Sequence, residues 1–136
     1  MTDDAIARVD TFLKLMAERK LAEAQTYLGP GVRMTFPPGI TFGSLQDLVA
    51  NAGRRYRWCD KVRERYDVFE REDGATVVYS LGTLFGENVH GAPFSGVRYL
   101  DRFVLRDGLI VEQDVWNDLA ESGVLAVHPA ASGAAS

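Results

Sequence analysis

The stretch DRFVLRDGLIVEQDVWND, residues 101–118, reads as two β-strands joined by a tight turn at Asp107-Gly108. An Asp-Gly pair between two apolar runs is a strong signal for a β-hairpin. The two strands also carry acids and amides among large apolar side chains. Each of these polar side chains is either exposed to solvent or lines a pocket. Deciding which of them line a pocket gives most of the functional information in the sequence.

The rest of the C-terminal half continues this pattern as a long antiparallel meander with Asp-Gly turns in both hairpins. Its strand-like segments are residues 61–71, 75–86, 95–106 and 109–118. The N-terminal half has apolar residues at helical spacing, interrupted by the turn-forming GPG and PPG. It predicts helices over 3–17, 20–28 and 44–58, a strand over 32–36, and a pairing of ITFG at 40–43 with that strand. Ser44, with Asp47 three residues on, suits a helix N-cap.

This order of elements predicts an α+β fold, in which a curved, mostly antiparallel sheet wraps around three helices from the N-terminal half. A curved sheet needs its concave face covered, and the three helices supply that cover, which leaves a cone with a cavity at its open end. Residues 1–120 are expected to form this one domain. Residues 121–136, which end in HPAASGAAS, are predicted to be a disordered tail.

Composition narrows the class of protein. The chain has 136 residues, of which 46% are hydrophobic and 25% charged, enough for one domain with a real core. Its net charge of −4 argues against nucleic acid as a partner. No apolar run approaches the length of a membrane helix, and no secretory signal is visible. The single cysteine, Cys59, fits a reducing compartment, so the sequence predicts a cytoplasmic protein.

Two stretches resemble the SnoaL-like (polyketide-cyclase-like) members of the nuclear-transport-factor-2-like cone-fold superfamily. They are FPPGITFGSLQDLVA at 36–50 and HGAPFSGVRYLDRFVLRDGLIVEQDVWND at 90–118, and with their strand partners the likeness covers about residues 3–120. The resemblance implies the cone fold and pairing of two copies through the convex face of the sheet. The superfamily holds isomerases, dehydratases, hydrolases and cyclases as well as domains that only bind or assemble, so enzyme and non-enzyme readings both stay open.

Strand parity assigns side chains to the two faces of the sheet. The more apolar face of the strand at 97–105 should meet the helices, and it carries Val97, Tyr99, Asp101, Phe103 and Leu105. Burial there would raise the pKa of Asp101 and suit it to acid–base catalysis. The alternative is that Asp101 bonds a nearby Arg, Tyr or backbone amide and only orients the sheet.

On the last strand, Gln113 and Asn117 should face the concave side, because Glu112 is then in solvent. The resemblance implies a catalytic aspartate on this strand, at the position that Val115 occupies. Asp114 lies one residue out of phase and should face outward unless a β-bulge intervenes.

His90 lies in the loop-like ENVHGAPF and, by analogy with the resembling family, near the cavity mouth. There it would act as an acid–base partner for Asp101, and otherwise it is a surface or turn residue. The aromatic residues offer material for a ligand pocket, or alternatively for a packed core and a dimer interface. The residues predicted to bind a ligand are Gln113, Asn117, Tyr99, Phe103, Tyr56, Met34 and Phe36. Trp116 should lie on the convex face, at the dimer interface.

The basic cluster between residues 54 and 65 is interpreted as a solvated face, paired with neighbouring acids, and Cys59 within it as a structural thiol. Two scattered histidines and one cysteine do not supply metal-ligand spacing. No glycine-rich phosphate loop and no nucleophile elbow occur. The sequence therefore predicts no metal and no cofactor.

The leading hypothesis is a cofactor-independent protein that binds a small apolar or polycyclic molecule in the cone. If it is an enzyme, Asp101 and His90 would catalyse an isomerisation, cyclisation or dehydration by proton transfer. The alternative is a non-catalytic, dimeric binding or assembly module of the same fold.

Overall fold

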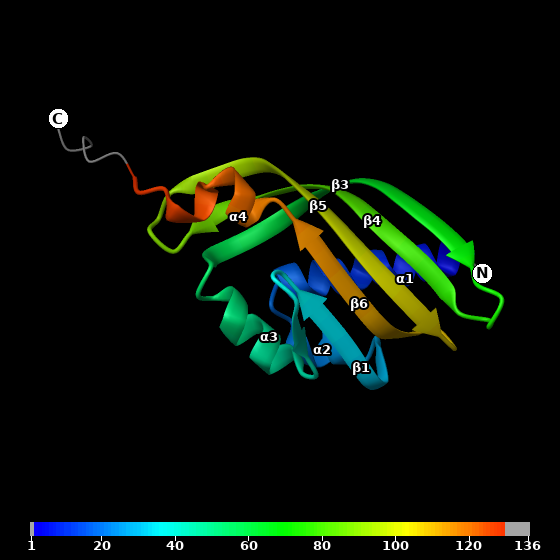
Figure 1. Ribbon diagram of the computed structural model, residues 1–136. Helices are drawn as coiled ribbons and strands as arrows, with labels where there is room; N and C mark the ends of the chain where they lie inside the picture. Colours follow the sequence, from blue (N-terminus) through cyan, green and yellow to red (C-terminus); the bar gives the residue numbers. More distant parts are fainter. Residues whose placement is uncertain (1, 130–136) are drawn as a thin grey trace.

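Helix α1, Thr2–Ala17, runs across the concave face of a curved six-stranded sheet in the computed structural model, which describes residues 2–129 (Figure 1). The strand order is β2-β1-β6-β5-β4-β3. The strands are β1 (Leu28–Phe36), β2 (Ile40–Phe42), β3 (Tyr56–Glu70), β4 (Thr76–Asn88), β5 (Pro93–Arg106) and β6 (Leu109–Asn117). The remaining helices are α2 (Leu21–Gln25), α3 (Leu45–Ala52), the short α4 (Leu119–Ser122) and the 3-10 turn η1 (Val124–Ala126). The α+β cone expected from the sequence is therefore present.

The predicted helices differ from the observed ones mainly where they end. The Oγ of Ser44 accepts a hydrogen bond from the backbone N–H of Asp47 at 3.2 Å, so the predicted N-cap of α3 is confirmed. The helix ends at Ala52 rather than near residue 58, because Tyr56 already pairs with Asn88 as the first residue of β3. Helix α2 is likewise shorter than predicted.

The strand predicted over 32–36 begins at Leu28, so GPG lies inside β1 and does not simply end a helix. Strand β1 pairs with β6 in parallel, with Leu28 opposite Ile110 and Met34 opposite Gln113. It also pairs antiparallel with β2, as predicted for ITFG. The parallel pairing places β1 beside the last strand, and β2 is then the edge strand on the side away from β3.

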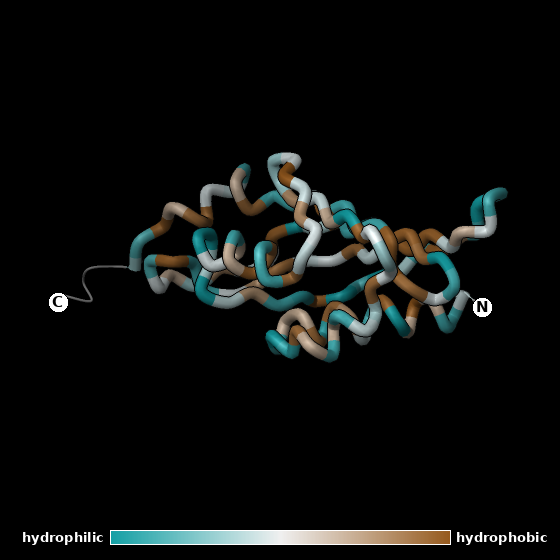
Figure 2. The backbone as a smooth tube through the Cα atoms, turned by 90° about the horizontal axis from the view of Figure 1, so that it is seen from below, coloured by the Kyte–Doolittle hydropathy of each residue, from teal (hydrophilic) through white to brown (hydrophobic). Residues whose placement is uncertain are grey.

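The main core lies between α1 and the concave face of the sheet. Phe12 of α1 meets Phe103 of β5 edge to face, with ring centroids 6.1 Å apart. Buried and partly exposed residues alternate along β4 and β5, which follows from the two-residue repeat of a strand. Hydrophobic and hydrophilic residues are interspersed along the backbone (Figure 2). Leu105 and Ile110 extend this core toward the turn of the hairpin. The two turn residues, Asp107 and Gly108, both have the positive φ of a tight hairpin.

The segment predicted as a disordered tail is ordered over its first part. Residues 119–126 form α4 and η1, and Leu119, Val124 and Leu125 pack on a second apolar cluster at the open end of the cone. The buried Asn88 side chain holds this segment, because its Nδ2 donates to the carbonyl oxygens of Val124 at 2.9 Å and Val127 at 2.7 Å. The rest of the predicted tail, residues 130–136, lies outside the described residues.

A β-bulge in β3 sets which of its side chains point inward. Arg63 pairs with Gly82 and Arg65 with Leu81, so Glu64 is an extra residue that shifts the register by one. The bulge depends on Gly82, because a Cβ at this position would lie 1.9 Å from the carbonyl oxygen of Val62. Only a residue without a side chain allows β3 and β4 to approach this closely.

Replacing Gly82 with alanine should therefore destabilise the fold by roughly 3 kcal/mol, since the backbone must move to relieve the overlap. The matched control is Gly43→Ala, where a Cβ meets nothing within 4 Å, and which should change stability by less than about 0.5 kcal/mol. Urea unfolding of the two variants measures the difference. Equal stabilities would show that Gly82 is not what permits the bulge.

Candidate functional site

Asp101 lies in the middle of β5 on the concave face, opposite Ser80 on one side and Val115 on the other. Its residue surface is 1% exposed, so strand parity placed this carboxylate correctly inside the cone. Neither carboxylate oxygen accepts a hydrogen bond from any residue within 2–129. Such a buried acceptor carries a large desolvation cost, which makes Asp101 the most unusual polar group of the interior.

Lys61 of β3 is the charged partner of Asp101. Its Nζ lies 3.8 Å from Oδ2 of Asp101, an ion-pair distance that is too long for a hydrogen bond. The same Nζ lies 5.1 Å from the ring centroid of Tyr99, in cation–π contact. The side chain of Lys61 is 24% exposed, so the ammonium group sits between the interior and solvent.

Sequence analysis missed Lys61, because it assigned the basic cluster to a solvated face. In a regular strand every second residue faces the same side, so alternation from the inward-facing Val68 and Tyr66 would place Lys61 on the outer face of the sheet. The bulge at Glu64 reverses this parity, and Cys59, Lys61 and Arg63 then face inward. The signal that points to the bulge is Gly82, a glycine inside an otherwise regular strand pattern.

Asp101 and Lys61 both line a cavity of about 60 Å³ beneath the sheet. Its wall is formed by α1 and Arg19 after it, the start of β3, and single residues of α3, β1, β5 and β6. The lining residues are Phe12, Leu13, Met16, Ala17, Arg19, Phe36, Leu48, Tyr56, Cys59, Asp60, Lys61, Asp101 and Gln113. Gln113 is also buried, and its Oε1 has no hydrogen-bond partner among the described residues.

Burial raises the pKa of Asp101 to about 6, against the opposing pull of the Lys61 ammonium. For Lys61, burial alone would lower the pKa, but the Asp101 carboxylate and the nearby thiol and phenols raise it above its ordinary value. Burial also raises the pKa of Cys59 to about 11 and that of Tyr56 above its usual range. At neutral pH the cavity therefore holds a charged amine, a neutral thiol and a neutral phenol around an acid that titrates near pH 6.

A second set of polar contacts connects the interior with the surface of α1. The hydroxyls of Ser80 and Tyr99 lie 2.9 Å apart, and the hydroxyl of Tyr66 donates to Oδ1 of Asp10 at 2.7 Å. Asp10 also pairs with Arg63 at 2.8 Å. Asp10 thus ties α1 to β3 through Tyr66 and Arg63, although Nη1 of Arg63 has no hydrogen-bond partner among the described residues.

The other residues predicted to bind a ligand divide into two groups. Phe36, Tyr56 and Gln113 line the cavity with Asp101. Met34 and Phe103 are fully buried in the main core, and the hydroxyl of Tyr99 contacts Ser80 while its ring lies under Lys61. The structure thus brings part of the predicted pocket together around Asp101 and uses Met34 and Phe103 for packing, whereas Tyr99 and Asn117 line a second, larger groove.

His90 and Asn117 do not line this cavity. The exposed His90 follows β4, and its ring stacks on that of His128 at a centroid distance of 3.9 Å. The Oδ1 of Asn117 accepts the backbone N–H of Leu119 at 3.1 Å and so positions the start of α4. Lys61, rather than His90, is the group that faces Asp101.

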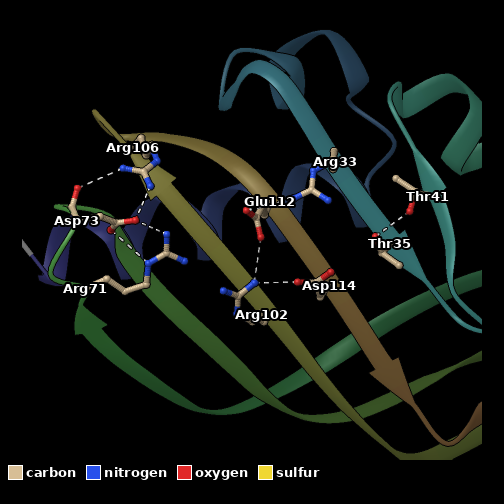
Figure 3. Close-up of polar contacts among 9 residues, drawn as sticks. All are labelled: Arg33, Thr35, Thr41, Arg71, Asp73, Arg102, Arg106, Glu112 and Asp114. Atoms are coloured by element: carbon tan, nitrogen blue, oxygen red, sulfur yellow. Dashed lines mark hydrogen bonds and ion pairs between the residues drawn. The ribbon is translucent and has the colours of Figure 1, made fainter.

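Asp114 points away from the cavity, on the convex face of the sheet. Its carboxylate accepts a hydrogen bond from Arg102 at 2.8 Å, beside Glu112 (Figure 3). A bulge does occur in β6, since Val104 pairs with Glu112 and Leu105 with Ile110, but it lies at Val111, and the alternation from Gln113 to Asn117 is that of a regular strand. The predicted outward position of Asp114 is therefore confirmed.

The convex face carries a larger, open groove of about 790 Å³. It lies between the Pro37-Pro38 turn, the end of β6 and α4, and its floor includes Leu81, Leu100 and Trp116. Trp116 is 55% exposed, on the face where parity placed it.

Among residues 2–129, no group of three or more His, Cys, Asp or Glu side chains is arranged to hold a metal ion. Within the same residues, no helix is both long and apolar enough to cross a membrane.

Several solved structures have a fold similar to that of this chain. An NTF2-like protein of unknown function from Burkholderia pseudomallei K96243 is similar with a TM-score of 0.73 and 17% identity, over 91% of this chain and 98% of that chain. TerC, co-crystallised with polyporic acid, matches with a TM-score of 0.71 and 13% identity, over 91% and 99%. A proposed SnoaL-like polyketide cyclase from Jannaschia sp. CCS1 matches with a TM-score of 0.70 and 18% identity, over 95% and 96%. The chain therefore has the NTF2-like cone fold.

No protein-family model matches the chain, and no curated protein does either. The likeness to SnoaL-like and other NTF2-like structures thus concerns the fold, at identities too low to transfer an activity.

The raised pKa of Asp101 predicts an unusual pH dependence of stability. The folded state holds the proton more tightly than the unfolded state, so the stabilising contribution is complete below about pH 3.8 and is lost as the pH rises through about 6. Between pH 7.5 and pH 4, the free energy of unfolding of the wild type should rise by roughly 2 kcal/mol relative to that of Asp101→Asn. Chemical unfolding at a series of pH values measures this difference, and parallel curves would contradict it.

Proposed function

We propose that this protein binds a small molecule in the Asp101 cavity and transfers a proton there without a cofactor. The observation that carries the proposal is a buried carboxylate that has no hydrogen-bond donor among the described residues and lies 3.8 Å from a charged lysine. Its pKa of about 6 is close to neutral pH, where a group serves equally well as acid and as base. Isomerisation, cyclisation and dehydration are reactions that such a group supports.

Asp101 would act as the acid or base and Lys61 as the cation that stabilises negative charge on the reacting molecule. Gln113 and Tyr56 would supply hydrogen bonds from the cavity wall. His90 has no part in this proposal, because it does not line the cavity with Asp101. The similarity to TerC and to a proposed SnoaL-like cyclase supports small-molecule binding as the general function of the fold.

The cavity favours a small ligand over a polycyclic one. Sites for drug-sized molecules have volumes of roughly 300 to 1,000 Å³, whereas this cavity has about 60 Å³. A polycyclic molecule would have to displace Phe36, Leu48 or Tyr56 from the wall. We therefore narrow the expected ligand to a small molecule with at least one polar group, and propose that it is met in the cytoplasm.

A fragment screen by ligand-observed NMR tests binding, with a set of neutral, anionic and cationic compounds of three to eight heavy atoms. Fragments that bind the cavity should be displaced by one another, and their affinity should change with a midpoint near pH 6 in the wild type but not in Asp101→Asn. A folded wild type that binds no fragment, or binds fragments equally well after Lys61→Met and Tyr56→Trp, would contradict the proposal.

A second candidate function, a dimeric binding or assembly module, is favoured by the convex groove. An exposed tryptophan with Leu81 and Leu100 around it is the composition of an interface centre, and the salt bridge between Arg98 and Asp118 at 2.8 Å lies at its edge. A symmetric partner would bury this patch against the same patch of a second copy.

Trp116→Arg should convert such a dimer to a monomer, because it places a charge at the centre of the apolar patch. Val127→Arg is a matched control, since Val127 is similarly exposed at 49% but lies outside the groove. Light scattering coupled to size-exclusion chromatography reads the mass of each. A wild type that is monomeric at high concentration would remove this candidate.

A further inference from the structure

The Asp101 cavity has polar groups that the protein itself leaves incompletely satisfied. Both oxygens of Asp101 and Oε1 of Gln113 lack a hydrogen bond from the described residues, and the ammonium of Lys61 has its one acidic neighbour at 3.8 Å. Because the orientation of a glutamine amide is interchangeable, Gln113 can present either its oxygen or its NH₂ to the cavity. Burial of so many unsatisfied groups favours a ligand that bonds several of them at once.

The charges in this cavity depend on one proton. While Asp101 is ionised, it compensates Lys61. When Asp101 takes up a proton, Lys61 keeps its charge but loses that compensation, and a partly buried cation without a partner is unfavourable. The protonated Asp101 then carries an O–H that donates a hydrogen bond.

The other charged and titratable groups near Asp101 do not replace its negative charge. Oδ1 of Asp60 accepts the backbone N–H of Lys61 at 2.7 Å and lies 4.0 Å from Nη1 of Arg63. Arg63 is paired with Asp10 through its Nε, and Arg19, which also lines the cavity, adds a further positive charge. The groups facing this region are Arg19 after α1, Tyr56, Cys59, Asp60, Lys61, Arg63 and Tyr66 on β3, Ser80 on β4, Tyr99 on β5 and Gln113 on β6.

We propose that the cavity is a site for a small carboxylate group, which binds Lys61 together with a proton on Asp101. The carboxylate would accept hydrogen bonds from the Lys61 ammonium, from the protonated Asp101 and from the Gln113 amide. A volume of about 60 Å³ corresponds to a few water molecules, which is the size of acetate or of the carboxylate end of a longer acid. This inference rests on the proposed binding function and names the chemical class of its ligand.

Because the carboxylate binds together with a proton on Asp101, its affinity must depend on pH. A carboxylate that binds only the protonated form has an apparent Kd that rises about tenfold for each pH unit above the pKa of Asp101. With that pKa at about 6, acetate should bind about a hundredfold more weakly at pH 8 than at pH 5. Above pH 7, the binding of each acetate ion should take up close to one proton from the buffer.

Calorimetric titrations with acetate, in two buffers of different ionisation enthalpy, measure both quantities on the full chain. Asp101→Asn is the decisive variant, because an amide imitates the protonated acid. It should bind acetate with nearly equal affinity at pH 5.5 and pH 8 and without proton uptake. Lys61→Met should lose binding at every pH, and heteronuclear NMR spectra report whether each variant is folded.

Acetamide, which is neutral and of the same size, is the control ligand and should bind at least tenfold more weakly than acetate at pH 5.5. Hexanoate distinguishes a free small acid from the end of a longer one: binding of both acids with proton uptake supports a longer ligand, and binding of acetate alone supports a small one. Acetate binding without proton uptake, or equal affinity for acetamide, would overturn the inference.

Failure of this inference is separable from failure of the proposed function. Neutral or cationic fragments that bind the cavity while acetate does not would leave the proposed function standing and refute the carboxylate site. If no fragment of any charge binds the folded protein, the proposed function itself is wrong.

Discussion

The interior of this cone is organised around the close approach of β3 and β4 at Gly82. Because no side chain separates the two strands there, Glu64 is accommodated as an extra residue, and the side-chain alternation of the preceding part of β3 is reversed relative to Tyr66 and Val68. That reversal brings Lys61 into the cone and opposite Asp101. The ion pair of the cavity therefore depends on a register shift that one close backbone contact permits, whereas the burial of Asp101, which raises its pKa, follows from its own place on the concave face of β5.

The charge pair has an energetic cost that the rest of the fold must cover. Removing two charges from water costs free energy, and their attraction offsets this cost only when their geometry and hydrogen bonding are good. Here the distance between Lys61 Nζ and Asp101 Oδ2 is long, and Asp101 lacks a hydrogen bond from the described residues. The stability comes instead from the apolar contact of α1 with β5 and from the contacts that close the open end of the cone, among them the four hydrogen bonds of Asn88. Polar groups that reduce stability in this way are commonly found at functional sites.

Most of the fold, and Asp101 itself, could be predicted from the sequence, because helical and strand periodicity act locally. The hairpin at 101–118 is specified by the Asp-Gly turn within it. The alternation of side chains along its two strands correctly assigns Asp101 to the concave face and Asp114 to the convex face. Three features depend on contacts between distant segments and were not predicted: the parallel pairing of β1 with β6, the docking of residues 119–126 by Asn88, and the inward position of Lys61. The sequence does contain one local signal for the inward position of Lys61, namely Gly82 inside a strand pattern. The effect of this glycine on β3 can be read only when the register between β3 and β4 is known.

The parallel pairing of β1 and β6 also constrains the order in which the chain can fold. Leu28 and Ile110 are partners, so β1 cannot join the sheet until nearly the whole domain has been synthesised. The hairpin of β3 and β4 and that of β5 and β6 need only neighbouring segments and can form earlier. During synthesis β1 must therefore wait without its partner β6, whereas α1 can already pack on β3 and β4, so the apolar residues of β1 stay exposed to aggregation and to chaperones for longer.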